Sequence, residues 1–329
     1  MKYEGIKLPL LLDLEMERFL ITGMNGAIAP YVARFADEMG GSVTASTRNG
    51  KLHREISKKL PCVACDITDF ESVKKTIRKT KPEVVVNFAA VSTLLQGWQD
   101  PVLTFKTNTI GTANFLESLR QLRMDTRFIA VGSREEYGVK KNLPINENES
   151  LGPINPYGVA KAAADMLAMQ YFKKYNVQTI CTRLFNQTAP IWPERFVDSN
   201  WCKQIARIEA GLAKPQIMVG ELDNVRDFTD CRDVARAFWL LAQKGKAGNA
   251  YNICSQKPTR MSDMLKGLLL KSTANVKIKT DPSRIFADQI KEVWGDNSKL
   301  RRHTGWKPEI SLETTHTELL THWRGACRA

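Results

Sequence analysis

A tyrosine and a lysine stand four residues apart at Tyr157 and Lys161, and Ser133 precedes them after an apolar run. Residues at this spacing share one face of a helix. A free tyrosine is a poor acid–base group because its pKa is near 10, but a nearby lysine and a cationic nicotinamide both lower that pKa. A serine at a strand end can donate a hydrogen bond to an oxygen on which charge develops. These residues therefore predict proton transfer coupled to hydride transfer.

The segment TGMNGAIA follows the first apolar run and predicts a nucleotide-binding turn. A glycine-rich turn between a strand and a helix lets a pyrophosphate approach the positive N-terminus of the helix. The cofactor-binding residues predicted in this turn are Gly23, Asn25, Gly26, Ala27 and Ile28.

The segment GGSVTASTRNGK bears on the choice of nicotinamide cofactor. It contains no carboxylate to hold the ribose hydroxyls of NAD(H), and it offers Arg48 and Lys51 instead. A cation suits a 2′-phosphate, so NADP(H) is favoured and NAD(H) is the alternative. An ordinary solvated side chain is the other interpretation of Arg48. Asp66 is placed to contact the adenine edge.

Short apolar segments alternate with amphipathic ones, which predicts the elements that position these residues. Strands are expected at 18–23, 41–47, 61–65, 83–90, 127–132 and 178–185. Helices are expected at 27–39, 70–79, 101–122 and 156–175. Strands separated by helices favour right-handed crossovers and a parallel sheet covered on both faces. The predicted fold is a Rossmann-type, doubly wound α/β fold.

The alternation ends near residue 186, which divides the chain into predicted domains. Residues 18–186 would form the cofactor-binding domain. Residues 187–329 would form mainly a smaller, discontinuous substrate-binding lobe, with about 226–254 returning to the first domain. Residues 1–17 would be an N-terminal extension.

Composition excludes several classes of function. The 329 residues carry a net charge of +13, but the tightest basic cluster, KKTIRKTK, is expected to be the solvated face of a helix, so no nucleic-acid partner is expected. No apolar run is long enough to span a membrane, and the first residues do not resemble a signal peptide. Seven scattered cysteines favour a reducing compartment, and neither Cys62-x-x-Cys65 nor the four histidines predict a metal site. A cytoplasmic protein without metal or membrane contact is expected.

Several motifs, in order and over nearly the whole chain, resemble the extended short-chain dehydrogenase/reductase family, also called the NAD-dependent epimerase/dehydratase family. They are TGMNGAIA, Asp66, NFAAVS at 87–92, Ser133, the Tyr157–Lys161 pair and RLFNQTAP at 183–190. The resemblance implies a nucleotide-linked sugar as substrate and a homodimer packed through helices 101–122 and 157–175. It adds five residues to the cofactor site, namely Ile67, Phe88, Ala89, Ala90 and Leu184, beside Tyr157 and Lys161.

The second half is similar to one branch of that family, the GDP-4-keto-6-deoxy-D-mannose reductases, through residues 219–239, 250–265 and 295–313. This similarity implies NADPH-dependent reduction of the 4-keto group of a GDP-linked 4-keto-6-deoxy sugar, giving GDP-D-rhamnose or a close analogue. The substrate-binding residues that it implies are Ser92, Glu135, Asn186, Val219, Gly220, Arg226 and Arg284.

Three alternatives stay open. In related 4,6-dehydratases a Ser or Thr, with a Glu two residues later, supplies the base that removes the proton at carbon 5, and Ser133 and Glu135 occupy those positions. Glu135 is therefore a candidate catalytic residue, and a GDP-mannose 4,6-dehydratase or a nucleotide-sugar 4-epimerase with retained cofactor is the alternative. A non-catalytic NADP(H)-binding regulator is a further hypothesis.

Two arginines have their own alternatives. Arg134 departs from the small residue usual in relatives, and Arg226 could instead pair with a neighbouring aspartate.

Overall fold

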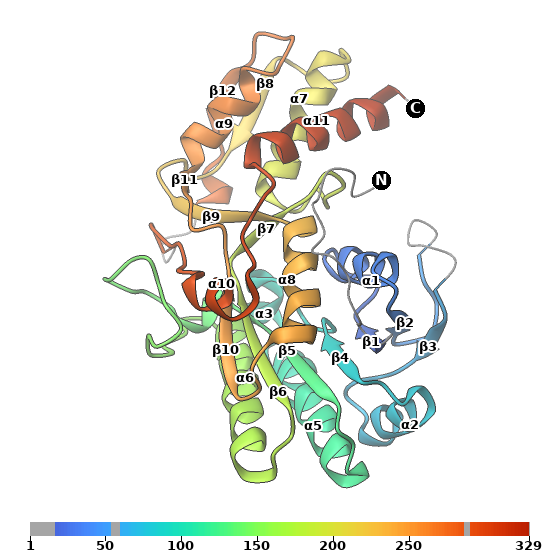
Figure 1. Ribbon diagram of the computed structural model, residues 1–329. Helices are drawn as coiled ribbons and strands as arrows, with labels where there is room; N and C mark the ends of the chain where they lie inside the picture. Colours follow the sequence, from blue (N-terminus) through green and yellow to red (C-terminus); the bar gives the residue numbers. More distant parts are fainter. Residues whose placement is uncertain (1–16, 54–59, 286–289, 329) are drawn as a thin grey trace. The chain divides into compact units, whose positions relative to one another are not determined.

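The computed structural model describes residues 17–53, 60–285 and 290–328, so the expected N-terminal extension lies outside the described residues except for Glu17 (Figure 1). The main sheet has seven strands, which are in spatial order β10 (Asn249–Ile253), β6 (Thr179–Leu184), β5 (Arg127–Ser133), β4 (Val84–Asn87), β1 (Arg18–Thr22), β2 (Ser42–Thr47) and β3 (Cys62–Ala64). The neighbours from β3 to β5 pair in parallel. The expected Rossmann-type α/β fold is confirmed.

Helices cover both faces of this sheet. Successive strand residues point to opposite sides, so each face presents its own side chains to a layer of helices. Leu20 and Val85 point to one side and join a buried cluster with Phe115 of α5 (Gly111–Leu122). Phe19 points to the other side and stacks on Trp239 of α8 (Cys231–Lys244), with ring centroids 5.6 Å apart. The other helices of this region are α1 (Ala29–Glu38), α2 (Phe70–Thr80), α3 (Leu94–Gln99), α4 (Pro101–Phe105) and α6 (Pro156–Tyr175).

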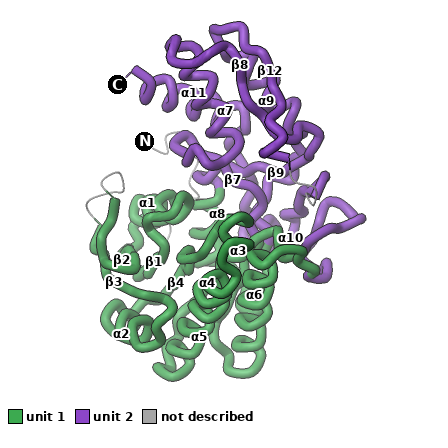
Figure 2. Tube along the Cα trace, turned by 180° about the vertical axis from the view of Figure 1, so that it is seen from behind, with its two compact units in different colours: residues 1–136, 152–183, 234–251 green, residues 137–151, 184–233, 252–329 purple. Residues whose placement is uncertain are grey.

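The chain forms two compact units, which Figure 2 colours separately. Unit 1 comprises residues 1–136, 152–183 and 234–251, and unit 2 comprises residues 137–151, 184–233 and 252–329. Unit 2 holds a three-stranded sheet, β11 (Pro258–Arg260), β9 (Val225–Asp230) and β7 (Asn186–Thr188), and the parallel pair β12 (Lys277–Thr280) and β8 (Gln216–Val219). Its helices are α7 (Val197–Glu209), α9 (Met261–Leu269), α10 (Ser298–Thr304) and α11 (Leu312–Arg328).

Local structure differs from the sequence-based expectation at several places. The helix expected at 101–122 is divided into α4 and α5 by a π-helical turn, η1 (Lys106–Ile110). Helix α3 was not predicted, because six residues are too few to show a helical period. Strand β9 was missed because it buries polar side chains, so its sequence VRDFTD lacks an apolar pattern.

Three further observations concern the described residues only. None of their helices is both long and apolar enough to cross a membrane. No three or more of their His, Cys, Asp and Glu side chains are grouped to hold a metal ion. All seven cysteines of the chain are unpaired.

Candidate active site

The turn between β1 and α1 fits the pyrophosphate of a dinucleotide. Gly23 has a φ of +67°, and a Cβ there would lie 2.6 Å from backbone atoms of Phe88 and Ala89, so a side chain at this position would clash. Gly26 donates its N–H to the Gly23 carbonyl at 2.8 Å, which closes the turn. Helix α1 then begins at Ala29 without a side-chain cap, so an anion can take the place of the cap. The other predicted residues of this turn are Asn25, Ala27 and Ile28.

Two predicted cofactor residues lie together after β2 and β3. Arg48 is exposed, and its Nε lies 4.0 Å from Oδ2 of Asp66. Burial tends to raise the pKa of Asp66, but hydrogen bonds from Thr68 and the charges of Arg48 and Lys106 outweigh it and lower that pKa. The pair therefore presents a cation that suits a 2′-phosphate beside an ionised carboxylate.

A buried asparagine holds the loop that follows β4. Asn108, in the π-helical turn, accepts the N–H of Val91 and donates to its carbonyl, both at 2.9 Å. Ala89 donates its N–H to Thr22 Oγ1 at 3.0 Å, and the ring of Phe88 packs 4.9 Å from an aromatic ring of α8. Sequence analysis missed Asn108 because its partner lies 17 residues away. Of the other predicted residues, Ala90 is half-buried, Ser92 is exposed, and Ile67 and Leu184 are buried.

The structure brings Ser133, Tyr157 and Lys161 together in unit 1. Ser133 ends β5, and its side chain shares a hydrogen bond with Tyr157. Tyr157 lies in the first turn of α6, which Asn155 caps. Lys161 follows one turn later, and its Nζ donates to the Val131 carbonyl at 2.5 Å. Ser133 and Tyr157 can together hold one substrate oxygen and deliver a proton to it.

Burial changes the pKa of both titratable side chains in this group. Loss of water raises the pKa of Tyr157, and the hydrogen bond with Ser133 offsets only part of that rise. The carboxylates of Glu135 and Glu136 raise it further. In the chain itself the pKa of Tyr157 is therefore raised, and the lowering expected from a cationic nicotinamide stays a prediction. Loss of water also lowers the pKa of Lys161 to about 8, against the attraction of Glu136.

A buried charge cluster next to these residues was not predicted. Glu136 is fully buried, and its Oε1 accepts the N–H of Ser133 at 2.7 Å. Arg183 of β6 lies between two carboxylates, with its Nε 3.0 Å from Asp165 Oδ2 and 3.4 Å from Glu136 Oε2. Burial and the charge of Asp165 raise the pKa of Glu136 well above its usual range. The cluster fixes the backbone of Ser133 and sets the charge that Lys161 experiences.

Glu135 lies in η2 (Arg134–Glu136), the 3₁₀ turn directly after β5. Its side chain is buried, and its charge contributes to the raised pKa of Tyr157. The structure thus places the base of the dehydratase hypothesis close to the Ser133–Tyr157 pair.

In unit 2 the structure brings Gly220 and Arg284 together. A Cβ on Gly220 would lie 2.6 Å from the carbonyl oxygen of Arg284, at the end of the 3₁₀ turn η3 (Pro282–Arg284). The guanidinium of Arg284 is oriented by Asp281 Oδ2 at 3.2 Å and by Asn200 Oδ1 at 3.0 Å. Val219 is buried at the end of β8, directly before Gly220.

Asn186 and Arg226 lie on the same face of two adjacent strands of unit 2. Asn186 begins β7 and pairs with Phe228 of β9, two residues beyond Arg226. The Arg226 guanidinium donates to the carbonyl oxygens of Val225 and Lys291, each at 2.9 Å. These two residues therefore present an amide and a guanidinium on one side of the sheet, which suits phosphate oxygens.

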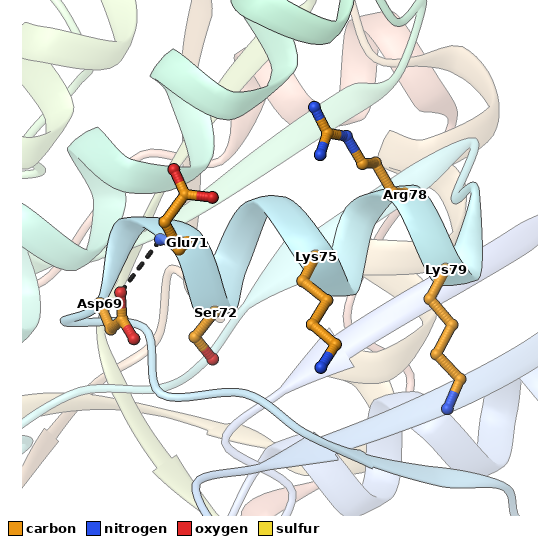
Figure 3. A pocket seen from close by; sticks show the side chains of 6 residues that line it. All are labelled: Asp69, Glu71, Ser72, Lys75, Arg78 and Lys79. Atoms are coloured by element: carbon orange, nitrogen blue, oxygen red, sulfur yellow. Dashed lines mark hydrogen bonds between the residues drawn. The ribbon is translucent and has the colours of Figure 1, made fainter.

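A separate hollow of about 770 Å³ lies along α2, and Figure 3 shows the side chains that line it. Lys75 and Lys79 extend from one side of the helix and Arg78 from the other, and all three are exposed (Figure 3). The expected solvated basic face is confirmed. None of the lining residues belongs to the predicted cofactor or catalytic sets.

Comparisons with known proteins agree with this geometry. Residues 20–319 match the protein family described as GDP-mannose 4,6 dehydratase. Over 249 residues the chain is 31% identical to the GDP-6-deoxy-D-mannose reductase of Pseudomonas aeruginosa, a match that covers 75% of this chain and 82% of the relative. It is 26% identical to a GDP-mannose 4,6-dehydratase of Vibrio cholerae, with 92% of each chain covered.

Among solved structures, the chain is similar to RMD from Pseudomonas aeruginosa complexed with NADPH. The TM-score is 0.83 at 26% identity, and the match covers 94% of this chain and 100% of the other. Fold and sequence thus point to the same group of proteins.

Proposed function

This chain belongs to the family described as GDP-mannose 4,6 dehydratase, within the extended short-chain dehydrogenases/reductases, and we propose that it reduces the 4-keto group of a GDP-linked 4-keto-6-deoxy sugar with NADPH. The chain is an NAD(P)-dependent oxidoreductase, and the product would be GDP-D-rhamnose or a close analogue. The observation that carries the proposal is the hydrogen bond that the Tyr157 phenol shares with Ser133, one helical turn before Lys161. Reduction needs such a donor, because the ketone oxygen must gain a proton.

The turn at Gly23–Ile28 would hold the pyrophosphate, and Asp66 would contact the adenine. Arg48 and Lys51 would hold the 2′-phosphate, since no carboxylate occurs between residues 42 and 52 to bind free ribose hydroxyls. NADPH, when bound, supplies the hydride for carbon 4 of the sugar. These residues support a preference for NADPH over NADH.

Ser133 would donate a hydrogen bond to the keto oxygen, and Tyr157 would donate its proton to the same oxygen as it becomes a hydroxyl. The cation of Lys161 then stabilises the phenolate left behind, until solvent returns a proton to it. Two hydrogen bonds support these roles. The Lys161 ammonium donates to the Val131 carbonyl, and the backbone N–H of Ser133 donates to the Glu136 carboxylate.

The diphosphate of the GDP-sugar would be bound by Asn186, Arg226 and Arg284, with Val219 and Gly220 beside the nucleotide. Planar guanidinium groups suit phosphate oxygens because they can donate two parallel hydrogen bonds. The fixed orientation of the Arg284 guanidinium, between Asp281 and Asn200, supports this assignment.

The second candidate is a 4,6-dehydratase or 4-epimerase that keeps its cofactor and returns the hydride to the same sugar. The observation that favours it is the place of Glu135, whose charge acts on Tyr157. In a dehydratase this carboxylate would remove the proton at carbon 5.

The test measures nicotinamide absorbance with the enzyme and either GDP-4-keto-6-deoxymannose or GDP-mannose. We expect one NADPH oxidised for each keto sugar, slower oxidation of NADH, and no oxidation with GDP-mannose. Conversion of GDP-mannose into a keto sugar without net oxidation of the cofactor would overturn the proposal in favour of the dehydratase.

The active form would be a homodimer in the cytoplasm. Large apolar side chains are exposed on the helices before and within the 101–122 region and on α6, among them Leu95, Trp98, Val102, Ile110 and Met166. Exposed apolar side chains grouped in this way favour burial against a second copy. Unpaired cysteines suit a reducing compartment.

A further inference from the structure

Glu135 is held by two partners on opposite sides of its carboxylate. Oε1 lies 2.8 Å from Nη2 of Arg134, and Oε2 accepts a hydrogen bond from Asn155 Nδ2 at 3.0 Å. The side chains of the ion pair are only 12% and 9% exposed, so water screens the interaction little. Hydrogen bonds between charged partners are stronger than neutral ones.

Both partners are fixed by the fold. Asn155 caps α6 through its Oδ1, which accepts the N–H of Gly158 at 2.8 Å, so its Nδ2 points to Glu135. Gly158 packs against the backbone of Glu135, where a Cβ would lie 2.6 Å from the Glu135 carbonyl oxygen. Glu135 therefore has little room to change its conformation, and it would have to break a buried ion pair to move.

The chemistry of a keto sugar gives this arrangement a consequence. A ketone at carbon 4 acidifies the C–H bonds at carbons 3 and 5, so a free carboxylate beside it can take one of these protons and form an enolate. The enolate can take up solvent hydrogen, change configuration or lose a hydroxyl group. A reductase avoids these side reactions of the keto sugar only if the neighbouring carboxylate does not act as a base.

We propose that Arg134 and Asn155 prevent the Glu135 carboxylate from acting as a base on the sugar. The site then reduces the keto sugar without converting it into an enolate. Arg134 is then the residue that determines reaction specificity, and it acts through Glu135 rather than on the substrate. The inference rests on the proposed reductase function.

The experiment places wild-type enzyme, GDP-4-keto-6-deoxymannose and NADP⁺ in D₂O, where no hydride donor competes, and measures deuterium at carbons 3 and 5 by NMR. In the proposed step the C–H electron pair passes to the enolate, the proton goes to the carboxylate, and a deuteron returns to carbon. Wild-type enzyme should exchange no faster than buffer. Arg134→Met, which keeps an unbranched apolar stem but removes the guanidinium and its charge, should exchange about tenfold faster or more.

Three variants control this result. Arg134→Lys keeps a cation and should exchange deuterium at the wild-type rate. The double variant Arg134→Met with Glu135→Gln should lose the added exchange of Arg134→Met. Asn155→Ser keeps a helix cap but removes the donor to Glu135, so it should also gain exchange and gives a test that does not depend on Arg134. A structural defect alone would not create a new exchange reaction.

Fast exchange by wild-type enzyme, or no gain in both Arg134→Met and Asn155→Ser, would overturn the inference. Persistence of the gain after Glu135→Gln would also overturn it, because another base would then be responsible. NADPH oxidation by wild-type enzyme with the same keto sugar separates the two proposals. If wild-type enzyme oxidises NADPH but the variants gain no deuterium exchange, only this inference is overturned. If wild-type enzyme oxidises no NADPH, the proposed function is overturned.

Discussion

Burial acts in opposite directions on the two titratable residues at the centre of the site. It raises the pKa of Tyr157, so the phenol remains a proton donor, and it lowers that of Lys161 to about 8, so the ammonium is close to losing its charge. Both effects have the same cause, since burial disfavours the charged form of each group. At neutral pH the chain itself therefore holds a protonated phenol beside a charged ammonium.

The first prediction concerns Tyr157→Phe. Removing the hydroxyl deletes the proton donor, so we expect turnover of the keto sugar to fall by about 10²–10⁴-fold. NADPH affinity, measured by fluorescence titration, should change little because the turn at Gly23 is untouched. Near-normal turnover would refute the role of the phenol.

The second prediction concerns pH. Because Lys161 carries its charge below a pKa of about 8, kcat/KM for NADPH should be level near pH 7 and fall as pH rises through 8. Glu136 favours the charged lysine, so Glu136→Gln should move this decline to lower pH. An unshifted decline would mean that Glu136 is neutral when Lys161 titrates.

Sequence could predict Ser133, Tyr157 and Lys161 because short-range spacing and strand ends define them. It could not predict Glu136, Asp165 and Arg183, since they meet only when β5, α6 and β6 are assembled. The raised pKa of Tyr157 in the chain itself could not be predicted for the same reason. Its value depends on burial, which a sequence does not display.

At the scale of elements, α7 and α11 are joined in unit 2 by a bidentate ion pair. Arg324 Nε and Nη2 lie 2.7 and 2.8 Å from the two carboxylate oxygens of Glu209. The hydrogen bonds from Arg324 lower the pKa of Glu209 to about 2. Trp323 adds a hydrogen bond from Nε1 to Ser199 Oγ at 3.0 Å.

The third prediction follows from this pair. A carboxyl group whose folded pKa is lowered from 4.5 to about 2 contributes stability above pH 4.5, and that contribution is lost as pH falls towards 2. Glu209→Gln should therefore reduce the free energy of unfolding by about 1.5–3 kcal/mol at pH 7 and by much less near pH 2.

Urea unfolding at both pH values measures the effect. The control is Glu313→Gln, which removes an exposed ion pair with Lys271 and should change stability little at either pH. An equal loss at both pH values would show that the Glu209 carboxylate acts through packing and not through charge.

Elements with a clear apolar period were predictable, and elements defined by tertiary contacts were not. The expected strands of the main sheet all form, and central strands bury apolar residues on both faces, as Val84, Val85 and Val86 do in β4. Strand β9 buries Asp227, whose carboxylate accepts the N–H and hydroxyl of Ser255, so its polar sequence concealed it. The π-helical turn places Asn108 against Val91, a requirement that periodicity does not express.

For the whole molecule, the net charge of +13 suits ligands rich in phosphate, and the exposed apolar side chains of unit 1 suit self-association. The fourth prediction is that Trp98→Glu, at a side chain that is 65% exposed, converts a dimer into monomers. Introducing a charge into a desolvated interface is strongly unfavourable. The control is Leu270→Glu in unit 2, where an apolar side chain is 80% exposed.

Sedimentation velocity distinguishes these outcomes. Wild type and Leu270→Glu should sediment as dimers, and Trp98→Glu as monomers. A wild-type monomer, or a Trp98→Glu variant that remains dimeric, would contradict the proposed interface.

The central claim is that hydride from NADPH ends on carbon 4 of the sugar. The most direct measurement uses NADPH deuterated at both C4 positions of the nicotinamide, with GDP-4-keto-6-deoxymannose and wild-type enzyme, and locates the label by NMR. We expect one deuterium on carbon 4 of each product sugar and an equal amount of NADP⁺. A sugar product without deuterium at carbon 4, or an unchanged ketone after prolonged incubation, would contradict the account.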